Sequence, residues 1–170
     1  MRTVSIVSIV YGAIGILWAT VVSVVIKFQS ALFSNFPWPE EMYEYMDIPS
    51  FLETIYGVIG TIFPFVFLIS LMYIISGILH LAGKPTFKAI AYAAAIFNIL
   101  WYISYMVIMQ IEVVPIFNSL ELVPKNLINI IFIFGMLINA IFYCGYPAFL
   151  IVFIRRGGKE WDTFDTEYTS

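Results

Sequence analysis

The chain has 170 residues, of which 62% are hydrophobic and 11% are charged, and its net charge is −3. Soluble domains are closer to half apolar and a quarter charged, so this composition excludes an ordinary water-soluble domain and indicates a lipid bilayer as the surroundings. The eight Lys and Arg residues are dispersed, which argues against nucleic acid as a partner, and the single cysteine excludes an intramolecular disulfide.

Four stretches without Asp, Glu, Lys or Arg are each longer than the roughly 20 residues that an α-helix needs to cross ~30 Å of hydrocarbon. They cover residues 4–26, 54–82, 89–111 and 127–154. Because a helix satisfies its own backbone hydrogen bonds in lipid, the sequence predicts an all-α, four-helix transmembrane bundle in a single domain. The first stretch is longer than the apolar core of a cleaved signal peptide, so we expect it to be retained as a span.

The first two spans contain nearly the same six residues, "VYGAIG" at 10–15 and "IYGVIG" at 55–60. Consecutive spans run in opposite directions, which disfavours an internal duplication, and a phosphate-binding glycine loop needs a preceding strand. Small residues spaced three or four apart instead predict helices that approach closely. We assign this packing role to Ser5, Ser8, Gly12, Gly15, Ala19, Gly57 and Gly60. The spacing leaves open whether the first span faces the second span or another subunit.

The segment 27–53 is predicted to be an outer loop that mixes acidic and aromatic residues. Its acidic residues do not have the spacing of an EF-hand loop, so we predict no metal site there. A solvated, negatively charged surface is the expected structure, and a docking surface for a partner is the alternative. The docking residues would be Trp38, Glu40, Glu41, Tyr43, Glu44, Tyr45 and Asp47.

The third and fourth spans each carry an asparagine near their middle, Asn98 and Asn139. An unpaired carboxamide in hydrocarbon is unfavourable, so we expect these two side chains to hydrogen-bond to each other. The alternative is a polar lining for a small cavity. The polar residues of the membrane core would then be Asn98, Asn139, Ser70, Tyr73, Tyr102 and Tyr143.

The cationic residues predict the orientation, because cytoplasmic segments are enriched in Lys and Arg. Six of the eight fall on the side of the two termini: Arg2, Lys84, Lys88, Arg155, Arg156 and Lys159. Both termini, and the tail 155–170, are therefore predicted to be cytoplasmic, with the chain in the plasma or inner cell membrane. The short segment 82–88 is predicted to be a tight turn in which Gly83 ends a helix.

The spans contain no charged residue, and the chain shows no nucleophile–base set, so we expect no catalytic residue, no metal and no cofactor. The predicted function is that of a non-enzymatic, multi-pass membrane protein that acts through helix–helix contacts, as an accessory or scaffold subunit or as a homo-oligomer. Its partners would be membrane lipids and other membrane subunits or further copies of itself. Two alternatives remain: a small transporter or channel with the polar cavity, and a lipid-modifying enzyme at the membrane interface.

Overall fold

The computed structural model describes residues 2–39, 48–119 and 124–167, and every element in these ranges is a helix. The four long helices are α1 (Arg2–Ser34), α3 (Ile48–Leu81), α4 (Phe87–Ile108) and α6 (Lys125–Glu167). A π-helical segment (Met109–Val113) and the short helix α5 (Val114–Ser119) continue the path of α4.

Four of these helical stretches are long and apolar enough to span a membrane, which confirms the all-α prediction with four candidate spans. The stretches are Thr3–Phe33, Pro49–Leu81, Phe87–Asn118 and Asn126–Arg156. Each is longer than predicted, and the expected loop 27–53 is reduced because α1 continues through Lys27 and α3 begins at Ile48. A lysine ends an apolar run but does not end a helix, since its long side chain can carry the charge away from the backbone.

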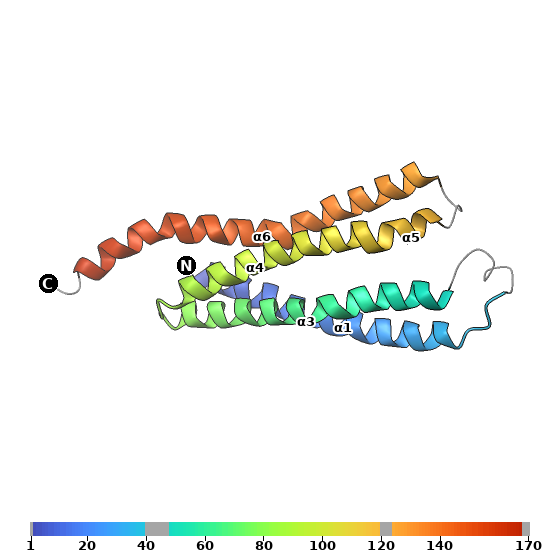
Figure 1. Cartoon of the computed structure of the whole chain (residues 1–170). Coiled ribbons are helices and arrows are strands. Elements are labelled where there is room, and N and C mark those ends of the chain that lie inside the picture. The colour runs from blue at the N-terminus through green and yellow to red at the C-terminus, as the bar shows by residue number, and fades with distance from the viewer. Residues whose placement is uncertain (1, 40–47, 120–123, 168–170) are drawn as a thin grey trace.

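The helices form two antiparallel pairs, α1 with α3 and α4 with α6, and α3 also packs against α4 (Figure 1). The N-terminus lies near the turn that joins α3 to α4, and we call this end of the molecule the hairpin end. We call the opposite end, where α1 ends and α6 begins, the loop end. The two pairs lie together toward the hairpin end and diverge toward the loop end (Figure 1).

The turn at the hairpin end has the predicted glycine geometry. Gly83 has a positive φ of 67°, a conformation that glycine adopts without strain. The Lys84 backbone N–H donates to the Leu79 carbonyl (2.9 Å), and the Gly83 N–H donates to the His80 carbonyl (3.1 Å). These two bonds satisfy carbonyl groups that the end of α3 would otherwise leave unpaired. The turn therefore fixes α3 and α4 as antiparallel neighbours.

One buried hydrophobic cluster lies in the half of the bundle near the hairpin end. Small side chains on one face of α4, Ala91 and Ala94, pack against Ile69 and Tyr73 of α3 and Leu150 of α6. Such small residues allow helix backbones to approach closely. Ile69 and Tyr73 also belong to the part of α3 that faces the centre of the bundle, where the polar side chains described next are found.

Candidate functional site

The stripe of small residues on α1 packs against α3 of the same chain. A Cβ atom added to Gly12 would lie 2.5 Å from the Ser70 backbone oxygen, and one added to Gly77 would lie 2.7 Å from the Ser5 backbone oxygen. Real Cβ atoms essentially never come this close, so both positions require glycine at the present helix separation. A Cβ on Gly15 would likewise overlap the Ser70 side chain. The structure thus gives the α1 stripe an intramolecular partner.

The glycines of the second hexamer have a different environment. A Cβ on Gly57 or Gly60 would meet nothing within 4 Å, and both residues are exposed. The structure therefore does not bring these two glycines into a close helix contact within the chain. Gly77, which the sequence analysis did not single out, takes that role on α3. It lies seven residues, about two helical turns, after Ser70, and this spacing is the signal that would have found it.

Asn98 is the centre of a hydrogen-bond network that joins the helices. Its Nδ2 donates to the Tyr11 hydroxyl (3.2 Å) and to the Tyr73 hydroxyl (3.4 Å), and the Tyr11 hydroxyl donates to the Phe142 carbonyl (3.2 Å). The Tyr11 and Tyr73 rings meet edge to face, with centroids 5.1 Å apart. Asn98 is buried, whereas Asn139 is exposed. The expected Asn98–Asn139 bond is therefore replaced by bonds from Asn98 to two tyrosines.

Two further side-chain bonds hold α1 in place near the hairpin end. The Ser5 hydroxyl lies 2.8 Å from His80 Nδ1 on α3, and the Ser8 hydroxyl lies 2.5 Å from the Tyr146 hydroxyl on α6. Ser5 and Ser8 are buried, so these bonds form away from solvent. The packing stripe consequently also supplies polar contacts, which are effective between helices because no water competes for them.

A cavity of about 590 Å³ lies between α1, α3, α4 and α6. Five of the six residues predicted for the polar membrane core line it: Asn98, Asn139, Ser70, Tyr73 and Tyr143. The sixth, Tyr102, is not among the lining residues, and its hydroxyl donates to the Met136 carbonyl on α6.

The walls of this cavity combine aromatic rings with neutral polar groups. Tyr11, Trp18 and Phe142 line it together with the five predicted residues, and its described lining contains no charged side chain. The sequence analysis missed these three aromatic residues as cavity residues. Tyr11 is part of the first hexamer. Its position one residue before Gly12 is the signal that could have predicted it near a helix contact.

Asn139 is the distinctive polar group of the cavity. Its side chain makes no hydrogen bond with any residue that the structure describes. It lies 13 residues into the candidate span Asn126–Arg156, which places it about 20 Å along the helix. A carboxamide in the middle of an apolar helix is favourable only with a hydrogen-bond partner, and the described residues do not supply one for Asn139.

The other predicted site residues are placed less completely. Trp38 is turned back onto α1: its Nε1 donates to the Phe33 carbonyl (3.1 Å), and its ring stacks on the Phe33 ring. The other members of the proposed docking surface lie outside the described residues: Glu40, Glu41, Tyr43, Glu44, Tyr45 and Asp47. Within the described ranges, no group of three His, Cys, Asp or Glu side chains is arranged to hold a metal ion.

Comparisons with protein families, with curated proteins and with solved structures find no match for this chain. Its functional interpretation therefore rests on the residues and their geometry.

Proposed function

We propose that this protein is a multi-pass membrane protein that binds a small neutral molecule in the four-helix cavity and carries it through the membrane. The four candidate spans support insertion into the bilayer. The distribution of Lys and Arg supports cytoplasmic termini in a plasma or inner cell membrane. The protein is a transporter rather than an enzyme in this proposal, and it uses no cofactor.

The observation that carries the proposal is the Asn139 carboxamide, which lines the four-helix cavity without a partner among the described residues. It offers two N–H donors and one acceptor oxygen. Asn98 and Ser70 line the same space. The aromatic walls suit the apolar body of the molecule, and the uncharged lining favours a neutral solute over an ion.

The route into the cavity runs between α1 and α6. The lining residues on these two helices include Trp18, which is 54% exposed, and Phe142, which is 68% exposed. The lining residues on the other two helices include the buried Tyr73 and Asn98. An opening between α1 and α6 therefore connects the buried polar groups with the surroundings of the bundle.

The first test asks whether water-soluble molecules reach Asn139. In a Cys144→Ser background, Asn139→Cys should react with a small, water-soluble thiol reagent in membranes, because the reactive thiolate forms only in water. Ile141→Cys is the matched control, since Ile141 is 72% exposed on the same helix but does not line the cavity. Equal protection of both cysteines would contradict a solvated cavity.

The second test measures transport in reconstituted liposomes. Stopped-flow light scattering would follow the uptake of acetamide, glycerol and a phenyl glycoside, which are neutral solutes of increasing apolar size. We expect protein-dependent uptake of at least one of them, with loss in Asn139→Leu and normal uptake in Ile141→Leu. Uptake that is the same in all three proteins, or in empty liposomes, would contradict the proposal.

An accessory or scaffold role is the second proposal. It is based on Gly57, which is exposed on α3 and where an added Cβ would meet nothing within 4 Å. An exposed glycine on a helix surface allows a helix from another membrane subunit, or from a second copy, to approach closely. Gly57→Leu should then dissociate an assembly on native gels while leaving monomer folding intact. The α1 glycines do not test this role, since their contacts lie within one chain.

A further inference from the structure

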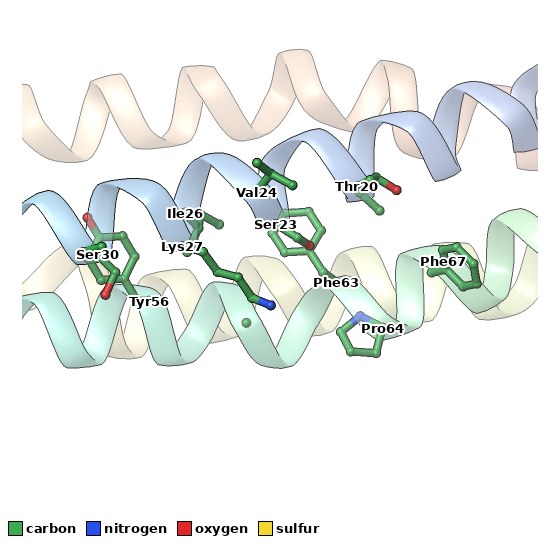
Figure 2. Close-up of a pocket in the computed structure, with 13 residues that line it drawn as sticks. Thr20, Ser23, Val24, Ile26, Lys27, Ser30, Tyr56, Phe63, Pro64 and Phe67 are labelled. Carbon is green, nitrogen blue, oxygen red and sulfur yellow. The ribbon is translucent and has the colours of Figure 1, made fainter.

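A second hollow lies between α1 and α3, nearer the loop end, and it is separate from the cavity of the proposed function. This groove has a volume of about 790 Å³ (Figure 2). It shares no lining residue with the four-helix cavity. On α1 it extends from Ala19 to Ala31, and on α3 from Tyr56 to Phe67.

The groove exists because α1 and α3 do not close on each other here. Gly60 lines it, and a side chain at this position would meet nothing within 4 Å. Toward the hairpin end the groove stops where Ala19 and Val66 pack together in a buried cluster. The missing side chain of Gly60 therefore leaves a trough that is open along the loop-end half of the two helices.

The two walls of the groove differ, because α1 contributes the polar side chains Thr20, Ser23, Lys27 and Ser30 and α3 contributes mainly aromatic rings. Ser30 and Tyr56 lie at its loop end, and Lys27 reaches from α1 toward α3 in the middle of the groove, between Tyr56 and Phe63 (Figure 2). Phe63 and Phe67 lie farther along α3, toward the middle of the candidate span.

Lys27 is the one charged side chain among the described residues that line the groove. It is the only charged residue of the candidate span Thr3–Phe33. The described residues that line the groove include no acidic one, and Lys27 makes no ion pair with any described residue. A lysine near the end of a span attracts anionic headgroups, which is worth about 1 kcal/mol per residue at a membrane surface.

We infer that this groove binds a phospholipid with an anionic headgroup. The headgroup phosphate pairs with the Lys27 ammonium and accepts a hydrogen bond from the Ser23 hydroxyl, while one acyl chain lies along Phe63 and Phe67. A phospholipid combines an anionic headgroup with apolar chains, as the groove combines the Lys27 ammonium with the Phe63 and Phe67 rings, and the exposed position of Gly60 leaves room for a chain. The inference rests on membrane insertion but not on transport.

The test uses photoactivatable phosphatidylglycerol in liposomes that contain the purified, full-length protein. After illumination, labelled peptides are mapped by mass spectrometry, and we expect labels within 19–31 and 56–67. Lys27→Gln should reduce labelling about fivefold, the factor that corresponds to ~1 kcal/mol. Lys27→Arg should preserve it. Gly60→Phe, which fills the trough, should reduce labelling to the background level.

Matched variants separate this site from general effects. Gly57→Phe places the same side chain three residues away, outside the groove, and Lys84→Gln removes a lysine at the hairpin end; both should label like the unmodified protein. Asn139→Leu should also label normally, so a failure of transport and a failure of lipid binding are distinguishable. Each variant must keep its elution volume in gel filtration.

Several results would overturn the inference. Equal labelling by photoactivatable phosphatidylcholine would remove the role of the headgroup charge, and unchanged labelling of Lys27→Gln would remove the role of the lysine. Loss of labelling when soluble glycerol phosphate is added before illumination would identify a free phosphate as the ligand instead. Protein–protein cross-links that occupy the groove in place of lipid would identify a helix of a second subunit as its occupant.

Discussion

The two glycine hexamers of this protein are nearly identical in sequence and opposite in environment. In α1, Gly12 lies against the backbone of α3 so closely that an added Cβ would be 2.5 Å from the Ser70 oxygen. In α3, Gly60 lines an open groove and has nothing within 4 Å. A pair of small residues therefore permits close approach of helices, but the facing helix decides whether the approach takes place.

The facing residues explain the difference. Opposite Gly12, helix α3 presents Ser70 and Ile74, whose short or apolar side chains fit a close contact. Gly60 shares its groove with Lys27 of α1. Closing the two helices at that level would bury an ammonium group between apolar surfaces, and this is strongly unfavourable without a counter-charge. The bundle is tight where α1 is uncharged and open where α1 carries its lysine.

The largest expected effect comes from leucine at Gly12. Gly12→Leu forces a branched side chain into the backbone of α3 and should lower the free energy of unfolding by about 3 kcal/mol. Gly57→Leu, at the matching position of the second hexamer, should change it by less than ~0.5 kcal/mol. Unfolding with sodium dodecyl sulfate in mixed micelles measures both values. Equal effects of the two variants would contradict the comparison.

The two asparagines provide the next test. Asn98→Leu removes the partner of the buried Tyr73 hydroxyl and should cost about 2 kcal/mol of unfolding free energy. Asn139→Leu removes a group that has no partner among the described residues, so it should cost less than ~0.5 kcal/mol while abolishing transport. The same micelle unfolding assay and the liposome uptake assay separate the two roles. A large loss of stability in Asn139→Leu would argue for a structural bond at that position.

A smaller effect is expected at the hairpin end. Ser5→Ala removes the bond to His80 and should lower the free energy of unfolding by about 1 kcal/mol. Ser23→Ala is the control, because Ser23 lines the open groove on the same helix. Its expected change is below ~0.5 kcal/mol. A larger loss of unfolding free energy in Ser23→Ala than in Ser5→Ala would contradict the conclusion that α1 packs tightly at Ser5 and borders an open groove at Ser23.

The smallest expected effects come from alanine at Gly60 and at Gly12, which should change the free energy of unfolding in opposite directions. Gly60→Ala adds a methyl group in open space and reduces the freedom of the unfolded chain, so it should raise the free energy of unfolding by about 0.5 kcal/mol. Gly12→Ala should lower it, since the added Cβ meets a backbone oxygen. Thermal unfolding in detergent gives both signs, and a stabilising Gly12→Ala would show that α1 and α3 separate easily.

Most of the fold follows from the sequence because long uncharged stretches are compatible with few structures other than long helices. Long uncharged stretches predict the four helices, and Gly83 predicts the turn between α3 and α4. The helix ends were predicted less well. Hydrophobicity marks the part of a helix that matches the hydrocarbon, whereas hydrogen bonding of the backbone carries α1 eight residues beyond Ile26, to Ser34.

The sequence predicted most residues of the cavity but not which of them form hydrogen bonds with each other. A polar side chain in an apolar span needs a partner, and this rule alone identified five of the cavity residues. The rule does not say which partner is chosen. Similar depth suggested Asn139 for Asn98, but the rotation of α1 and α3 about their axes brings Tyr11 and Tyr73 to Asn98 instead. Such rotations depend on packing between helices, which no single span encodes.

The bonds from Ser8 to Tyr146 and from Tyr11 to the Phe142 carbonyl join the first long helix to the last. Chains are synthesised from the N-terminus, so the fourth wall of the cavity arrives only when α6 leaves the ribosome. In the proposed membrane topology, Asn98 and the tyrosines on α1 and α3 would face lipid on that side until then. A nascent chain stalled before α6 would therefore expose polar groups within the bilayer, which makes completion of the last helix a natural checkpoint for insertion.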